Sequence, residues 1–528
     1  EEELEAFTGR RHVLTMSSGT AALHAAYFGV HIGHGDEVLV PGYTFFATAM
    51  PLFQLGALPV VVDSNLFGGP DLAEAEALLS PKTKALVVTH MWGVPVETQP
   101  YRDFCDKYGL ALIEDISHAV GGRTVRGTHV GDLADVAACS FQEAKNISAG
   151  EGGSLSTNSE DIHARALLLG HFNKRCLAEI SADHEWSAYR ETGVGLKYRM
   201  HGLAAAMGLA SLDDLGKRLA CRRQYARLMQ DKILSSATFR IWPGLQRSVE
   251  GSAHYAFPFL SRLTSNIINK HVLEEFAEAV GLPSFDRPAS SRSLGLFPIF
   301  HFPPEKFGNG TTTCLRRPSF VADWLSVKTF KVSVPHQELG ADDFLRRFYE
   351  FVDRIDEMFH DQCDEDEGSG FPLESVVRSR AALDDVSQLV TGLALLDCSA
   401  AVPKVLLIRR VPEDFLGGVE ELPGGGVDPS ESVASAVIRE AQEETGIRIG
   451  TPLGGVTSQF DYVNEWGGRA RQLNFGVEVG HDIQVSLNAE EHSEYRWVAV
   501  NELDATDCTP EVRESIRRGV ASMGLRYA

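Results

Sequence analysis

The chain has 528 residues, too many for one hydrophobic core, and the usual domain size of about 150 residues predicts about three domains. The apolar fraction of 44% and the charged fraction of 23% are typical of a globular protein and exclude a fibrous or wholly disordered chain. The formal charge of -23 argues against nucleic acid or an acidic membrane surface as a general partner, because their phosphates would be repelled.

The eight cysteines are scattered, with no Cys-x-x-Cys pair, and predict reduced thiols in a cytoplasmic protein. No apolar run reaches the roughly 18 residues that a membrane helix needs, and we expect no secretory leader. The first residue is Glu1 instead of methionine, so we expect part of the native N-terminus to be missing.

The first distinctive feature is a capping sequence, Ser17 to Thr20, before a run of small and apolar residues from Ala21 to Phe28. This pattern predicts a buried helix whose N-terminus faces a cavity. Free backbone N–H groups, the close approach that Gly19 allows and the Thr20 hydroxyl would suit a phosphate there. An ordinary helix cap is the alternative.

Apolar runs then alternate with helical patterns, which predicts a mainly parallel sheet covered by helices on both faces. Ligands of such folds bind at the C-terminal ends of the strands, where Asp115 and Ser140 fall. A helix N-cap is the alternative for Asp115. The predicted strands are Glu37–Val40, Leu58–Val62, Lys84–His90, Leu110–Asp115, Val136–Phe141 and Gly153–Thr157.

Lys145 lies between the last apolar residues of one predicted strand and the glycine-rich turn from Gly150 to Gly153. An amine held at a strand exit suits Schiff-base chemistry, because a desolvated lysine loses its proton readily and becomes a nucleophile. A surface lysine in a loop is the alternative.

The rest of the chain predicts two further domains. A long helix from 200 to 232, broken near Gly216, leads into a mixture of short strands and helices. The run from Asp364 to Gly370 has nothing apolar to bury and predicts a solvated linker. We therefore expect a large domain at 1–235, a small α+β domain at 236–360, an acidic flexible linker at 361–385 and a final domain at 386–528.

Five blocks in the first part of the chain resemble the DegT/DnrJ/EryC1/StrS family of sugar aminotransferases, in order and in spacing. The resemblance covers residues 1 to 360 and implies a pyridoxal-phosphate transferase of fold type I, with a mainly parallel seven-stranded sheet. The blocks are Ser18–Leu23, Pro41–Thr48, Glu114–Ala119, Ser140 to Lys145 and Gly150–Gly153.

The resemblance also implies a role for each matching residue. Lys145 would bind pyridoxal 5'-phosphate covalently and then shuttle a proton, and Asp115 would keep the pyridine nitrogen protonated. Phe45 would stack on the ring, and His118 would lie near the 3'-oxygen of the cofactor. The phosphate would be bound by Gly19, Thr20 and Ser140.

The block from Gly195 to His201 resembles the family segment that reaches the cofactor of a neighbouring subunit, which implies a homodimer with shared sites. Lys197 stands where many members carry asparagine, and it would meet the phosphate as a point charge. Because Lys145 is a lysine and not the histidine of the related dehydratases, transamination is expected. The donor would be glutamate or glutamine, and the acceptor a keto-sugar or a cyclitol ketone of secondary metabolism; dehydration or ring aromatisation is the alternative.

Near the C-terminus, three glutamates are spaced to share one helix face, namely Glu440, Glu443 and Glu444. A divalent cation would relieve their mutual repulsion, whereas a solvated acidic face is the alternative. The glycines at 424–426 and Gly446, placed as a helix C-cap, favour the cation.

From Gly425 to Ile447 the spacing resembles the Nudix hydrolase box, which implies an α/β/α domain that hydrolyses a nucleoside diphosphate derivative with Mg2+ or Mn2+. The implied metal ligands are Gly425, Glu440, Glu443 and Glu444, of which Glu443 and Glu444 would be catalytic. Glu431 and Arg439 would brace the loop and helix, and Glu491 would serve as base. A nucleotide sensor that hydrolyses nothing is the alternative.

Overall fold

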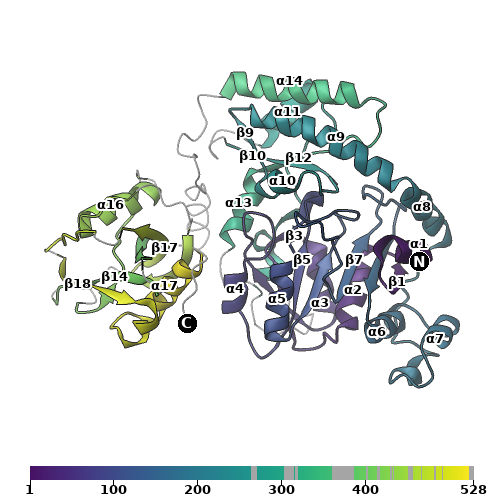
Figure 1. Cartoon of the computed structure of the whole chain (residues 1–528), viewed down its shortest axis with the longest axis horizontal. Coiled ribbons are helices and arrows are strands. Elements are labelled where there is room, and N and C mark those ends of the chain that lie inside the picture. The colour runs from purple at the N-terminus through teal and green to yellow at the C-terminus, as the bar shows by residue number, and fades with distance from the viewer. Residues whose placement is uncertain are drawn as a thin grey trace. The chain divides into compact units, whose positions relative to one another are not determined.

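The computed structural model forms two compact units, Glu1–Cys363 and Asp364–Ala528, which we treat separately (Figure 1). The linker expected at 361–385 lies outside the residues that the structure describes. Among the described helices, none combines the length and the apolar character that crossing a membrane requires. The described residues are 1–262, 270–301, 314, 319–359, 386–399, 402–412, 417–428, 431, 433–449, 456–464, 467–480, 483–489 and 491–522.

A seven-stranded sheet in the order β1-β8-β7-β6-β5-β2-β4 forms the centre of the first unit. Its last five strands are parallel, whereas β8 runs antiparallel to both β7 and β1. This confirms the predicted mainly parallel sheet, although the short strand β1 was not predicted. The strands are β1 (His12–Met16), β2 (Glu37–Pro41), β4 (Leu58–Val62), β5 (Thr83–Thr89), β6 (Ala111–Asp115), β7 (Val136–Ser140) and β8 (Gly153–Thr157).

Helices cover both faces of this sheet. Alternate residues of a strand point to opposite sides, and here the residues on both sides are apolar and pack against helices. Val38 and Val40 pack in the core that contains α2 (Gly19–Gly29), α3 (Met50–Gln54) and α6 (Glu160–Gly170), whereas Leu39 packs with α4 (Leu72–Ala77) and α5 (Gln99–Tyr108). The helix α2 is buried almost all round, as predicted. Two short helices, α1 (Glu2–Thr8) and α7 (Lys174–Glu179), flank this part.

The second half of this unit begins with α8 (Gly202–Asp213) and α9 (Leu215–Leu234), which meet at Asp214, two residues before the predicted break. A three-stranded sheet follows, in the order β12-β10-β9. The short strand β11 (Ser291–Ser293) pairs with β3 (Tyr43–Phe45) in a separate two-stranded sheet, and this pairing joins the second half of the unit to the segment that follows β2. The remaining elements are β9 (Phe239–Ile241), α10 (Pro243–Ser248), β10 (Phe257–Ser261), α11 (Lys270–Ala279), α12 (Pro298–His301), α13 (Phe320–Lys328), β12 (Thr329–Val332) and α14 (Ala341–Phe359).

The second unit is built on a mixed sheet in the order β15-β14-β13-β17-β16, with β18 also paired to β14. Strands β13 and β17 are parallel, and the other pairs are antiparallel. The strands β13 and β14 precede the glycines at 424–426. The elements are β13 (Gln388–Asp397), β14 (Lys404–Arg410), β15 (Glu420–Glu421), α16 (Val433–Thr445), β16 (Val456–Val463), β17 (Arg469–Val479), β18 (His492–Ala499) and α17 (Pro510–Ser522).

Candidate functional sites

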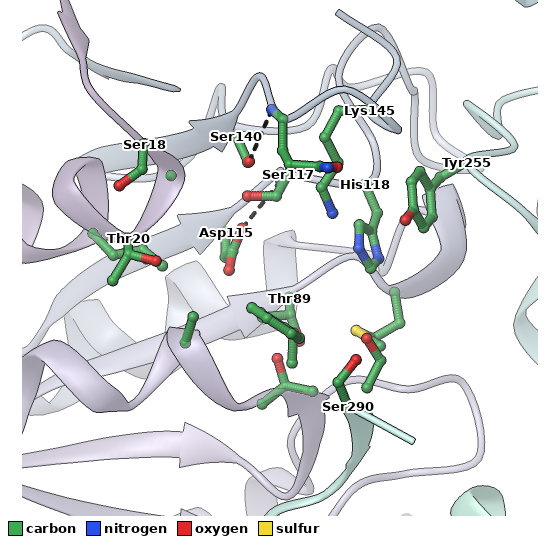
Figure 2. Close-up of a pocket in the computed structure, with 18 of the residues that line it drawn as sticks. Ser18, Thr20, Thr89, Asp115, Ser117, His118, Ser140, Lys145, Tyr255 and Ser290 are labelled. Carbon is green, nitrogen blue, oxygen red and sulfur yellow. Dashed lines mark hydrogen bonds between the residues drawn. The ribbon is translucent and has the colours of Figure 1, made fainter. Parts of the chain in front are cut away.

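A cavity of about 310 Å³ lies at the C-terminal ends of β5, β6 and β7, whose last residues, Thr89, Asp115 and Ser140, all line it (Figure 2). This is the edge at which open parallel sheets bind ligands. Seven of the eight residues predicted to bind a cofactor line the cavity, namely Gly19, Thr20, Phe45, Asp115, His118, Ser140 and Lys145.

The N-terminus of α2 forms one wall. Its N-cap is Ser18, whose hydroxyl accepts a hydrogen bond from Ala21 N at 3.1 Å, so the predicted cap is present as well. A Cβ on Gly19 would lie 2.6 Å from Ser140 Cβ, and only glycine lets the helix end approach β7 this closely. The amide groups of Gly19 and Thr20 therefore lie beside the Ser140 side chain, and this set of donors fits a phosphate.

Asp115 is buried at the end of β6, and both of its carboxylate oxygens accept hydrogen bonds. Thr48 Oγ1 donates at 2.9 Å and Ser117 N at 3.0 Å. The residues after Asp115 form turns instead of a helix, so the N-cap alternative does not apply. A buried carboxylate held at two points can meet a cationic ring nitrogen in the cavity.

Lys145 lies in a tight turn after β7, where its amide donates to Gln142 O at 2.8 Å. Its side chain lines the cavity, which excludes the alternative of a free surface lysine. Burial lowers the pKa of the Lys145 amine to about 8, while Asp115 and Cys139 act in the opposite direction. About a tenth of this amine is therefore unprotonated at pH 7, far more than for an ordinary lysine, and the free amine is the form that a nucleophile requires.

His118 is buried, and its Nδ1 accepts a hydrogen bond from Trp92 N at 3.3 Å. Burial, together with the positive charges of Lys145 and Lys331, lowers the pKa of His118 well below its ordinary value. The ring is therefore neutral with its proton on Nε2, the nitrogen left to donate a hydrogen bond to a ligand.

Several residues that line the cavity were not predicted. Tyr255 and Ser290 come from the second half of the unit, where no motif marks them. Thr48 does not line the cavity, but it contacts Asp115 from the short 3-10 helix after β3. The other unpredicted lining residues include Thr44, Met91, Ser117, Gln142, Glu151 and Ser291.

Lys197 is exposed and does not line this cavity. Its segment runs along the sheet edge, where Ser17 N donates to Tyr198 O at 2.7 Å and Tyr198 N donates to Gly170 O at 2.9 Å. Within this chain Lys197 does not contact the cavity, and its predicted contact with the cofactor of a neighbouring subunit stays a prediction.

In the second unit, α16 carries the three predicted glutamates in two environments. Glu440 and Glu444 are buried, whereas the Glu443 side chain is 57% exposed. Glu444 Oε2 accepts a hydrogen bond from Gly424 N at 2.6 Å, and a Cβ on Gly425 would lie 2.4 Å from the Glu440 carboxyl group. Gly425 is needed because its backbone passes directly over the Glu440 carboxylate, whereas Gly424 is needed because a Cβ there would meet the carbonyl oxygen of Thr391.

Arg439 connects this loop to the helix. Its Nε and Nη2 donate to the two carboxylate oxygens of Glu431 at 2.9 and 2.8 Å, and Nη2 also donates to Gly426 O at 2.9 Å. Its Nη1 donates to Glu440 at 2.7 Å and to Glu443 at 2.9 Å. This is the bracing contact expected from the sequence, and it places Glu443 against an arginine.

One oxygen or nitrogen atom from each of Glu444, Glu491 and His492 lies within 4.8 Å of the others. Burial, followed by the nearby Glu421, Glu440 and Glu491, raises the pKa of Glu444 well above its ordinary value. A cluster of carboxylates whose charge is disfavoured fits a divalent cation. His492 was not predicted, although it adjoins Glu491 in the sequence.

The sheet topology, with a lysine, an acid and a helix end at the strand termini, defines an aminotransferase fold. A solved aminotransferase from Psychrobacter cryohalolentis superimposes with a TM-score of 0.59 at 25% identity, over 68% of this chain and 91% of that one. The chain belongs to the DegT/DnrJ/EryC1/StrS aminotransferase family, whose model matches residues 1–284. Residues 387–519 match the NUDIX domain, so a Nudix domain follows.

Two curated relatives carry activities or pathways in their names. GDP-perosamine synthase of Caulobacter vibrioides is 36% identical over 238 residues, which are 44% of this chain and 60% of that protein. Spore coat polysaccharide biosynthesis protein SpsC of Bacillus subtilis is 36% identical over 225 residues, which are 41% of this chain and 57% of that protein. The chain thus spans about three fifths of the length of these relatives.

Proposed function

We propose that the chain is a bifunctional enzyme, in which a pyridoxal-phosphate aminotransferase, expected at 1–360, precedes a Nudix diphosphate hydrolase, expected at 386–528. The observation that carries the first half is the meeting of Lys145, Asp115 and His118 in one cavity beside the N-terminus of α2. Membership of an aminotransferase family supports the same reaction class.

The residues of the cavity fit pyridoxal phosphate as a bound cofactor. Gly19, Thr20 and Ser140 would hold its phosphate, Phe45 would pack against its ring, and Asp115 would pair with its ring nitrogen. When bound, this cofactor supplies an aldehyde for a lysine amine and a cationic ring that accepts electrons. A Lys197 from a second subunit would add a positive charge near the phosphate.

The protein groups then hold and move protons. The Nζ of Lys145, with a pKa of about 8, is suited to take a proton from the substrate carbon and to return it later in the reaction. His118 donates from Nε2 and stays neutral, and Asp115 stays fixed by Thr48 and Ser117. Asp115 and His118 are buried, which limits the access of water to both groups.

We propose glutamate or glutamine as the amino donor and a keto-sugar or cyclitol ketone as the acceptor. The relatives named for perosamine synthesis and spore coat polysaccharide synthesis support a sugar. To test the reaction, the purified protein is mixed with each donor while the cofactor absorbance is recorded. Conversion of the pyridoxal to the pyridoxamine form is expected; if neither donor causes it while a keto-sugar loses water, dehydration replaces this proposal.

For the Nudix unit we propose hydrolysis of a nucleoside diphosphate derivative. Glu440, Glu444 and Glu491 would hold Mg2+ or Mn2+, with Glu443 and the carbonyl of Gly425 at its edge. A bound cation supplies charge neutralisation at the diphosphate and an activated water. Release of phosphate or nucleotide from a panel of nucleotide sugars is expected for the wild type and not for Glu444→Gln. Binding without turnover across the panel would favour a nucleotide sensor.

We also propose that the protein works as a homodimer. On α8 only Gly208 is buried, whereas Leu203, Met207 and Leu209 are 74, 55 and 47% exposed. A helix this apolar is stabilised when a second surface covers it, and a second copy would also bring its Lys197 to the shared site. Light scattering should give twice the chain mass for the wild type and the chain mass for Leu203→Asp.

A further inference from the structure

The ring of Tyr255 contacts two cavity residues that lie on different loops. It stacks on the His118 ring with a centroid distance of 4.1 Å and an angle of 7°, and the Nζ of Lys145 lies 4.5 Å from its centroid. Figure 2 shows Tyr255 beside His118, with Lys145 next to both. One aromatic side chain thus touches both the proposed nucleophile and the proposed hydrogen-bond donor.

A buried arginine fixes the segment that carries Tyr255. Arg222 Nη1, on α9, donates to the carbonyl oxygen of His254 at 3.0 Å and to Asn146 Oδ1. Asn146 Nδ2 in turn donates to Ala253 O at 3.0 Å. The residue before Tyr255 is therefore tied to the residue after Lys145, and the distance between the two side chains does not depend on the stack alone.

We propose that Tyr255 is a positioning residue, whose aromatic face keeps the Lys145 amine and the His118 ring in fixed positions relative to each other. The proposal rests on the proposed function only for the identity of Lys145 as the reacting amine. A ring beneath an ammonium group attracts it electrostatically, and a ring stacked on an imidazole fixes the imidazole plane. Both effects need the ring and not the hydroxyl group.

The electrostatic consequence can be measured on the Lys145 amine. The charged or titratable groups that act on it are Asp115 from β6, Cys139 from β7 and His118 from the turn after β6, with Lys331 from β12 acting on His118. The Tyr255 face favours the ammonium form, in opposition to the effect of burial. Loss of the ring at constant apolar volume should therefore make the amine less basic.

The test uses the full chain freed of cofactor. The rate of acetylation of Lys145 by acetic anhydride is followed from pH 6 to pH 11 by mass spectrometry of the peptide that contains it. We expect an apparent pKa near 8 in the wild type and in Tyr255→Phe, and a pKa lower by about one pH unit in Tyr255→Leu. Tyr189→Leu, which removes a 48% exposed ring outside the cavity, should match the wild type.

An unchanged or higher pKa in Tyr255→Leu would overturn the proposal, and so would a fall of equal size in Tyr255→Phe. If Tyr255→Leu does not fold, as judged by circular dichroism, Tyr255→Met also lacks a ring and replaces it. Borohydride reduction of the cofactor-loaded wild type separates the two proposals. A pyridoxyl group absent from the Lys145 peptide refutes the proposed function, whereas the acetylation series tests Tyr255 alone.

Discussion

Thr48 Oγ1 donates a hydrogen bond of 2.9 Å to the buried carboxylate of Asp115. The Thr48 hydroxyl also lies 3.0 Å from Thr44 Oγ1, and the carbonyl oxygen of Thr48 accepts from Tyr27 Oη at 2.5 Å. Thr44 from β3 and Tyr27 from α2 therefore hold Thr48, and the Thr48 hydroxyl orients the acid that we assign to the cofactor ring. Polar networks of this kind are costly to interrupt when they are buried.

Replacing Thr48 by valine keeps its shape and removes the hydroxyl. A hydrogen bond to a charged group contributes about 1.5–3 kcal/mol, so we expect kcat/KM to fall about ten- to a hundredfold and cofactor affinity to weaken. Steady-state kinetics and a pyridoxal-phosphate titration measure both. Thr48→Ser restores the hydroxyl and should recover most of the loss. A valine variant as active as the wild type would show that Thr48 does not orient Asp115.

The low pKa of Lys145 also predicts a pH-dependent stability difference between the wild type and Lys145→Met. The folded protein binds a proton at this amine with a pKa of about 8, whereas the unfolded chain does so near 10.5. The cost of burying the charge is therefore complete below pH 8, shrinks as pH rises from 8 to 10.5, and vanishes above that range.

Lys145→Met in the cofactor-free protein should thus be more stable than the wild type by about 1–3 kcal/mol at pH 7, and by much less at pH 10. Urea unfolding of both proteins at the two pH values gives the difference. Lys174→Met, at the start of an exposed helix, is the control and should show no such trend. An equal advantage at pH 7 and at pH 10 would mean that the amine is not desolvated.

The residues that the sequence revealed are those fixed by local pattern. Asp115, Ser140 and Lys145 follow continuous apolar runs, and such runs become parallel strands whose ends meet at one edge. The capping residue Ser18 and the adjacent Gly19 likewise indicate the N-terminus of a helix. Here the order of the blocks in the sequence was sufficient to predict that residues more than a hundred positions apart lie at one site.

The residues that the sequence did not reveal depend on tertiary contacts. Tyr255 reaches the cavity because Arg222 ties its segment to Asn146, and Ser290 does so because β11 pairs with β3. Neither contact produces a periodic pattern of residues in the sequence. Helical spacing likewise placed Glu443 with the other two glutamates, but packing decides which of them are buried, and Glu443 is not.

Arg439 predicts a stability effect in the Nudix unit. It holds Glu431 through a two-point contact and also pairs with Glu440 and Glu443, so its removal takes one cationic partner from each of these three carboxylates. We expect Arg439→Ala to destabilise this unit by about 1–3 kcal/mol and Arg439→Lys to recover little, because an ammonium cannot reproduce the planar fork. Unfolding is followed through hydrolase activity or Trp497 fluorescence, and a fully rescuing lysine would contradict the two-point contact.

Two adjacent glycines provide the sharpest test of the metal site. A Cβ on Gly425 would lie 2.4 Å from the Glu440 carboxyl group, whereas a Cβ on Gly426 has as its nearest neighbour the Gln388 Nε2 at 3.4 Å. Gly425→Ala must therefore displace Glu440, and we expect the affinity for Mn2+ to fall about ten- to a hundredfold. Gly426→Ala changes the same loop by the same methyl group and should bind Mn2+ nearly as the wild type does. Calorimetric titration with Mn2+ measures both variants, and equal affinities would exclude Glu440 from the site.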